Sequence, residues 1–398
     1  MRVPKTLGGR EIPPFAWLAA AAFGFGLAFS IFITVSTNFL VEEIGIRPSE
    51  LGLLETIREV PGLLTIVMGA ALMTIAEPVV GAVALLLLCI GYVNYFHVES
   101  MEVLIIFSLT QSIGFHLWWP VANTIALRLS SIETQGRRLG QLRSLMAGAN
   151  LVGILVVLLA VTVLATGIRP LFLLAGGVAA LAAVAVWQLR SMGKIGQPPR
   201  VVLRRRYWLY YALTFLDGGR RHIFMTFAIF LLVDSYGVPV RTITILALIN
   251  SMVSIGGAYF FGRLIDRIGE RPVLVVAFGA LAAIFVGYAV VPWLGVLFVL
   301  YILDHLFFSA EVGITTYLRR ILVTPDDLRP SLVAGQTMNH VAAVALPVTG
   351  GILWEAFGHQ VPFIGGAGLA VMALMLSMLV RRKGDVPVEA PAAAAAGS

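Results

Sequence analysis

Twelve stretches of about 20 mostly apolar residues dominate this sequence, and each can cross the ~30 Å hydrocarbon layer of a bilayer as an α-helix. They cover residues 15–40, 51–73, 78–98, 103–127, 145–164, 171–189, 207–233, 243–261, 273–291, 294–318, 332–354 and 363–380. Pro292 and Trp293 divide the ninth stretch from the tenth. The division is needed because one helix of about 45 residues would overrun any bilayer. We therefore expect an all-α membrane protein with twelve transmembrane helices.

The composition agrees with a chain whose surface meets lipid. Hydrophobic residues make up 59% of the 398 residues and charged residues only 12%. A soluble domain carries about twice that share of charge. The net charge of +7 does not indicate nucleic-acid binding, because the basic residues are spread over short loops between apolar runs. The lipid bilayer is the expected partner.

The distribution of basic residues predicts the orientation. If the N-terminus is cytoplasmic, 22 of the 28 lysines and arginines fall in cytoplasmic segments, as the positive-inside rule requires. Both termini are then cytoplasmic. The short loops favour a bacterial inner (plasma) membrane, and we expect the chain to act as a monomer.

The chain divides into two similar halves. Residues 190–206 form its most polar connection, with six basic residues and two prolines. A shift of 189 residues aligns the HLWW segment at His116 with HLFF at His305, and Asn150 with Asn339. Such parallel repeats predict two bundles related by an axis along the membrane normal. The expected units are a cytoplasmic N-terminal segment (1–14), an N-terminal six-helix bundle (15–189), the basic linker (190–206), a C-terminal six-helix bundle (207–380) and a disordered cytoplasmic tail (381–398).

One short motif resembles a known family. The stretch from Gly262 to Pro272 reads GRLIDRIGERP, which is similar to the loop signature of the major facilitator superfamily between spans 8 and 9. The copy that this family carries between spans 2 and 3 is nearly erased, since residues 69–78 read GAALMTIAEP. The resemblance implies the major facilitator fold, two pseudo-symmetric six-helix bundles and alternating access.

The same motif predicts a gate at the cytoplasmic side. A loop carboxylate can pair with a helix N-terminus or a facing arginine in one conformer and release it in the other. The alternative is that the basic residues only fix the topology, although topology alone requires no aspartate. The expected gating residues are Gly262, Asp266, Arg267, Gly269 and Arg271.

Charged side chains inside the spans are the strongest functional signal, because a charge at the bilayer centre costs at least ~2.5–3.5 kcal/mol. Span 2 carries Glu55, Arg58 and Glu59; span 4 carries His116, Trp118 and Trp119; span 7 carries Asp217, Arg220, Arg221 and His222; span 10 carries Asp304, His305 and Glu311. For each set the alternative is structural, with side chains that pair and fix helix packing.

We expect these sets to divide the work of transport, and the resemblance implies that spans 1, 4, 7 and 10 line the central cavity. The substrate-binding candidates are Arg220, Arg221, His116, Trp118, Trp119 and His305, and the proton-coupling candidates are Asp217, Asp304, Glu311 and Glu59. An arginine can bind an anion, whereas a carboxylate can titrate.

The sequence therefore predicts a secondary active transporter for a small organic solute, anionic or amphiphilic, coupled to H⁺. The chain shows no phosphate-binding loop of an ATPase and no catalytic motif, so neither an enzyme nor a cofactor is expected. One alternative is a divalent metal-ion transporter that uses His116, Asp304, His305, Glu311 and His340. Another is a receptor or scaffold that keeps the architecture without transport.

Overall fold

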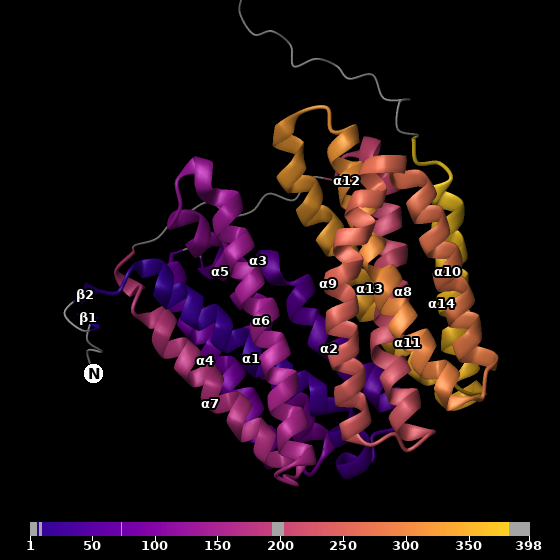
Figure 1. Cartoon of the computed structure of the whole chain (residues 1–398), viewed down its shortest axis with the longest axis horizontal. Coiled ribbons are helices and arrows are strands. Elements are labelled where there is room, and N and C mark those ends of the chain that lie inside the picture. The colour runs from indigo at the N-terminus through magenta and orange to yellow at the C-terminus, as the bar shows by residue number, and fades with distance from the viewer. Residues whose placement is uncertain (1–5, 8–9, 73, 193–202, 382–398) are drawn as a thin grey trace, which may run out of the picture.

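The computed structural model describes residues 6–7, 10–72, 74–192 and 203–381, and its helices form two bundles (Figure 1). The predicted tail, apart from Arg381, and most of the predicted linker lie outside the described residues. Near the N-terminus, β1 (Thr6–Leu7) and β2 (Arg10–Glu11) form a short antiparallel pair. The predicted boundaries of the bundles stay a prediction.

Six helical rods build the N-terminal bundle. They are α1 (Pro14–Asn38) continued by η1 (Phe39–Ile44), α2 (Pro48–Leu63) followed by α3 (Thr65–Leu72), α4 (Glu77–Tyr95), α5 (Met101–Arg128), η2 (Ile132–Thr134) with α6 (Gln135–Thr162), and α7 (Ile168–Trp187) followed by η3 (Arg190–Met192). The second rod breaks after Leu63, where Pro61 lies in its last turn. A proline removes a backbone donor and disturbs the preceding turn.

Six more rods build the C-terminal bundle. They are η4 (Arg205–Tyr207) with α8 (Trp208–Asp234), α9 (Val240–Ile268), α10 (Glu270–Val290), α11 (Leu294–Phe308) with η5 (Ser309–Glu311) and α12 (Val312–Ile321), η6 (Pro325–Asp327) with α13 (Leu328–Phe357), and α14 (Gln360–Ser377). The rods match the twelve predicted spans in order, including the break between α10 and α11 at Pro292 and Trp293.

Hydropathy separates two rods from the rest. Within the described residues, ten helices are long and apolar enough to cross a membrane. The remaining rods are α2–α3 and α8. These are the rods that carry the Glu55–Glu59 and Asp217–Arg221 charge sets. The low hydropathy of both rods therefore reflects their charges.

The two bundles meet most extensively along α2 and α13, a contact that we call the α2–α13 seam. Gly52 faces the backbone of Pro347 so closely that any larger residue would collide with it. Gly351 approaches the backbone of Pro48 in the same way. Thr56 Oγ1 donates a hydrogen bond of 2.8 Å to the carbonyl oxygen of Val344. Small residues are the usual means by which helices pack closely in lipid.

The bundles converge at one end of the molecule and diverge toward the other (Figure 1). We call the end that carries the α5–α6 and α12–α13 connections the basic end, and the other the opposite end. At the opposite end, Arg47 Nη1 lies 3.3 Å from Glu355 Oε1 of the other bundle. There too, Asn38 Nδ2 donates a 3.1 Å hydrogen bond to the carbonyl oxygen of Val238. The molecule is therefore closed at the opposite end.

Candidate functional site

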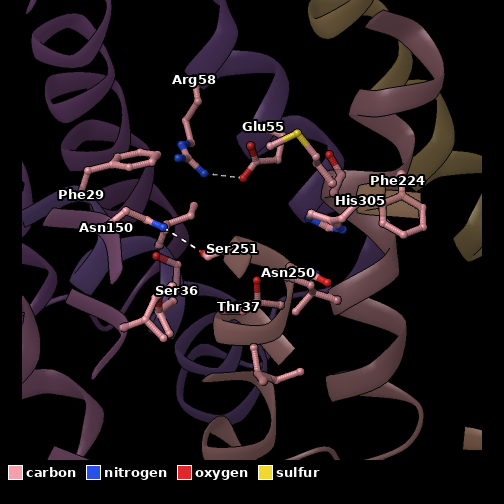
Figure 2. A pocket seen from close by; sticks show the side chains of 18 of the residues that line it. Phe29, Ser36, Thr37, Glu55, Arg58, Asn150, Phe224, Asn250, Ser251 and His305 are labelled. Carbon is pink, nitrogen blue, oxygen red and sulfur yellow. Dashed lines mark hydrogen bonds and ion pairs between the residues drawn. The ribbon is translucent and has the colours of Figure 1, made fainter. Parts of the chain in front are cut away.

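A cavity of about 560 Å³ lies between the bundles (Figure 2). Helices α1, α2, α5 and α6 form one wall, and α8, α9 and α11 form the other. Helices α1, α5, α8 and α11 correspond to spans 1, 4, 7 and 10, which the family resemblance implies as the cavity lining. Helices α2, α6 and α9 add to that set. A site between two bundles can be exposed to either side of a membrane in turn when the bundles rock.

The polar face of α2 enters this cavity. Glu55, Arg58 and Glu59 all line it, because their spacing places them on one face of the helix. Arg58 Nη1 lies 2.5 Å from Glu55 Oε1, and both side chains are about four-fifths buried, with 16% and 22% exposure (Figure 2). Glu59 points across the seam, and its Oε2 lies 2.9 Å from His340 Nδ1 on α13. The three neighbouring charges thus serve two different contacts.

Aromatic rings form the apolar walls of the cavity. On the N-terminal side, the ring centroids of Phe29 and Phe115 are 5.0 Å apart. On the C-terminal side, Phe224 stacks on Tyr301 with centroids 5.7 Å apart, and His305 packs against Tyr301 at 4.8 Å. These rings can contact the planar or apolar part of a bound molecule.

Neutral polar groups complete the lining. Asn150 Nδ2 donates a 3.1 Å hydrogen bond to Ser251 Oγ and so joins the two bundles at mid-depth (Figure 2). Gln111 is buried, and its Nε2 has no hydrogen-bond partner within the described part of the chain. Asn250 is also buried in the lining. Amides at these positions can orient a solute by hydrogen bonds.

The charged set on α8 lies behind the cavity wall. Arg220 has no exposed surface. Its Nη2 lies 2.9 Å from Asp217 Oδ1 and its Nη1 lies 3.0 Å from Asp304 Oδ1. Asp217 is 6% exposed and Asp304 is 4% exposed. We call these three residues the Arg220 triad. None of them is among the cavity-lining residues in this conformation, and their predicted roles stay predictions.

Arg221 is held by a second set of partners. Its Nη1 lies 2.9 Å from Glu311 Oε2, its Nη2 donates a 2.6 Å hydrogen bond to Asn339 Oδ1, and its guanidinium lies over the ring of Phe308. Glu311 belongs to η5, where the α11–α12 rod is interrupted. This group also lies outside the cavity lining.

The candidates on α5 and α11 divide between lining and packing. His116 and His305 line the cavity. Trp118 has no exposed surface and packs against Phe25 with centroids 5.8 Å apart. Trp119 is 39% exposed and lines a second hollow of about 520 Å³ with Arg143 and Asn150. The two tryptophans therefore have different environments although they are adjacent in the sequence.

The Asp266 motif lies at the basic end, where α9 meets α10. Asp266 and Arg267 are exposed in the last turn of α9, and Arg271 is partly exposed in α10. Gly269 has φ +85°, a conformation that favours glycine and lets α10 begin directly after α9. Glu270 forms an ion pair with Arg320 of α12. Gly262 has open space around it, and the gating role of this motif stays a prediction.

The sequence gave no role to two residues that the structure brings to the site. His340 contacts Glu59, and His222 lines the cavity. A signal for His340 was present, because Gln336 and His340 lie one turn apart on an otherwise apolar helix and interact at 3.1 Å. In the described part of the chain, no group of three or more His, Cys, Asp or Glu side chains is arranged to hold a metal ion. The geometry therefore disfavours the metal-ion alternative.

Two helical bundles around a central cavity define a membrane transporter. The Major Facilitator Superfamily pattern matches residues 18–321 and 209–397. No curated relative matches the sequence significantly. The chain belongs to the major facilitator superfamily, and it is a secondary transporter and not an enzyme.

Solved structures share the fold. The nucleoside transporter NupG superposes with a TM-score of 0.76 at 13% identity, over 92% of this chain and 99% of that chain. A bacterial homologue of the human lysosomal transporter Spinster, in an inward-facing and occupied conformation, superposes with a TM-score of 0.70 at 15% identity, over 92% of this chain and 96% of that one. At such identities the likeness concerns the fold alone.

Proposed function

We propose that this transporter carries a small organic solute, anionic or amphiphilic, and that proton movement drives it by alternating access. The observation that supports this most is the polar face of α2, whose Arg58, Glu55 and Glu59 lie in the wall of a cavity shared by both bundles. Arginine presents a planar fork that suits a carboxylate or phosphate. Carboxylates supply the groups that take up and release protons.

The remaining lining fits the rest of such a solute. The volume of about 560 Å³ lies within the ~300–1,000 Å³ typical of small-molecule sites. Paired rings on both walls, Phe29 with Phe115 and Phe224 with Tyr301, suit a planar or apolar moiety. Nucleosides enter as one test solute because NupG is a nucleoside transporter, but the likeness to NupG carries no more weight than that.

Competition for one arginine gives a coupling scheme. An anion that reaches Arg58 takes it from Glu55, its present partner at 2.5 Å. A carboxylate that loses its counterion in a low-dielectric site binds a proton more readily. The sequence-based proposals for Arg220, Arg221, Asp217, Asp304 and Glu311 concern other conformers, in which these side chains reach the cavity.

We place the basic end in the cytoplasm of a bacterium, with both termini inside, because most lysines and arginines lie in connections at that end. The conformer that is closed at the opposite end then faces inward. Rocking of the bundles would close the basic end, with the Asp266 motif as part of that gate.

Uptake into proteoliposomes tests the proposal. Aromatic carboxylates, nucleosides and lipid-like amphiphiles are supplied at pH 6 and pH 8, with and without an imposed proton gradient. We expect one anionic or amphiphilic class to accumulate with the gradient, and Arg58→Gln to lower its uptake at least tenfold. Arg241→Gln, at an exposed arginine outside the cavity, is the matched control and should transport normally. Uptake that ignores the gradient and Arg58→Gln would overturn the proposal. A chain that binds one of these solutes but never accumulates it would be a receptor.

A further inference from the structure

A buried cluster of one carboxylate and three imidazoles lies beside the α2–α13 seam, and we call it the histidine cluster. It consists of Glu59 on α2, His116 on α5, His222 on α8 and His340 on α13. The N-terminal bundle contributes the first two and the C-terminal bundle the last two. Glu59 Oε2 lies 2.9 Å from His340 Nδ1, and His116 and His222 interact electrostatically with the same carboxylate. The cluster therefore exists only while the seam is closed.

The packing around these rings is tight. The ring centroids of His116 and His340 are 5.2 Å apart, with the ring planes at 76°. A Cβ atom on Gly62 would lie 2.5 Å from His340 Cε1 and 2.6 Å from His116 Cε1. Only glycine leaves room for both imidazoles at this point. The sequence thus places a glycine where two histidines from different bundles converge on one glutamate.

Neighbouring arginines are engaged elsewhere. Arg58 on α2 contacts Glu55. Arg221 on α8 contacts Glu311. His222 Nε2 has no hydrogen-bond partner in the described part of the chain. The other charged groups that interact with the cluster are Arg58 on α2 and Arg221 and Asp217 on α8. The imidazoles are therefore the groups closest to hand for balancing the charge of Glu59.

His340 can hold one proton or two without losing its contacts. Its Nε2 lies 3.1 Å from the Gln336 side-chain amide and its Nδ1 faces Glu59. A neutral ring with the proton on Nδ1 donates to Glu59 and accepts from the amide nitrogen of Gln336. A charged ring donates from both nitrogens, and a flipped Gln336 amide then presents its oxygen. Proton uptake here needs no rearrangement of the backbone.

Charge balance links the proton to the seam. With neutral imidazoles, the closed cluster has one negative charge, and burying an unbalanced carboxylate in a membrane protein is costly. One proton makes it neutral. When the seam parts, Glu59 and His116 leave with one bundle and His340 and His222 with the other. Glu59 then meets the aqueous cavity, where a carboxylate is solvated and needs no counter-proton.

We propose that the histidine cluster is a proton-binding site shared by the two bundles, so that closing the α2–α13 seam binds a proton and opening it releases one. This rests on the proposed function and names the site at which proton and conformation are linked. Linkage fixes the size of the effect: a closed state that binds one more proton than the open state gains up to about tenfold in population for each unit that the pH falls.

Distances across the opposite end test this without any solute. Glu99→Cys on the N-terminal bundle and Ser235→Cys on the C-terminal bundle, both exposed, carry spin labels in a background with Cys89→Ala. Pulsed electron resonance in nanodiscs then gives the ratio of closed to open populations between pH 6 and pH 8. We expect this ratio to rise several-fold or more on acidification. Glu59→Gln, which keeps the shape but cannot bind the proton, should flatten the response, and so should His340→Gln.

Glu355→Gln is the matched control, because it removes another carboxylate that joins the bundles, the partner of Arg47. It should keep the pH response of the parent protein. A response that survives both Glu59→Gln and His340→Gln, or that Glu355→Gln removes equally, overturns the proposed site. Proton-driven uptake that persists in that case leaves the proposed function standing. A pH response in the distances without proton-driven uptake has the reverse meaning.

Discussion

Two groups of buried charges, on α2 and on α8, use the same kinds of residue in different ways. In the Arg220 triad, one guanidinium without exposed surface contacts Asp217 and Asp304, all within the C-terminal bundle. On α2, Arg58 contacts Glu55 in the cavity wall, while Glu59 reaches His340 in the other bundle. The first group is complete within one rigid unit, and the second depends on how the two units are placed.

This difference separates stability from transport. A contact within one bundle keeps its geometry when the bundles rock, so it can support the bundle throughout the cycle. A contact that crosses the seam must break when the seam opens, and an ion pair in the cavity wall can exchange its partner for a solute. We therefore assign a structural role to the Arg220 triad in this conformer and transport roles to the face of α2.

The largest effect should come from Arg220→Leu. This change leaves Asp217 and Asp304 buried without their cation, and removal of one partner from a buried ion pair costs about 3–5 kcal/mol. We expect a large fall in the thermal unfolding temperature in detergent and a low folded yield. In contrast, Arg58→Gln should lower stability by less than about 1 kcal/mol, because its side chain borders the cavity.

A compensated variant makes this prediction strict. Arg220→Met combined with Asp217→Asn and Asp304→Asn removes all three charges, and replacing a buried ion-pair network by neutral groups is often tolerated. Recovery of the folded yield would identify stranded charge as the cause. An Arg220→Leu protein as stable as the parent would end the structural assignment.

The next largest effect should be on solute affinity in Arg58→Lys. Lysine keeps the charge but loses the planar fork. We expect the KM for the transported anion to rise about tenfold, or about 1.4 kcal/mol, with little change in the unfolding temperature. Arg220→Lys tests the sequence-based alternative. If it raises KM more than Arg58→Lys does in protein of normal stability, the triad and not α2 binds the anion.

The pH profile of uptake distinguishes the two groups further. Asp304→Asn should leave it unchanged, because the geometry places the proton site at Glu59, and Glu59→Gln should flatten it between pH 6 and pH 8. The sequence alone favoured Asp304 as a carrier. A flat profile in Asp304→Asn together with a normal profile in Glu59→Gln would reverse the comparison and move proton coupling into the triad.

Sequence reasoning reached the rods and the charges but not most of the partners. The twelve spans followed from hydropathy and length, and the break between α10 and α11 from Pro292 and Trp293. The contact of Arg58 with Glu55 needed only the helical repeat. The contact of Glu59 with His340 spans 281 positions and needs the rotation and depth of two helices from different bundles. A span boundary uncertain by a few residues shifts depth by about a turn, which is enough to change which side chains meet.

A moderate effect is expected from Asp266→Asn at the basic end. Asp266 is exposed, so its loss leaves no charge stranded in lipid and folding should be preserved. If the motif forms part of the gate, the ratio of conformers should shift several-fold, and uptake should fall through that shift. The labels at positions 99 and 235 report it directly. An unchanged ratio would reduce the motif to a role in topology.

The smallest effect should come from His359→Gln, which tests whether any histidine near the seam can produce a pH response. His359 lies in the turn between α13 and α14, beside Trp354, with ring centroids 5.8 Å apart. Burial lowers the pKa of this imidazole. Its folded form therefore binds protons less readily than its unfolded form, so its contribution to stability is present above the ordinary pKa of about 6.5 and is lost as the pH falls below it. Since much of the ring stays accessible, solvent screens this contribution and keeps it small. Thermal unfolding at pH 5 and pH 8 should show a slightly weaker acid destabilisation in His359→Gln, while the pH response of the distances should stay that of the parent protein. A flattened distance response in His359→Gln would mean that a histidine bound to a single bundle can drive the seam, and the contrast between contacts within a bundle and contacts across the bundles would no longer explain the coupling.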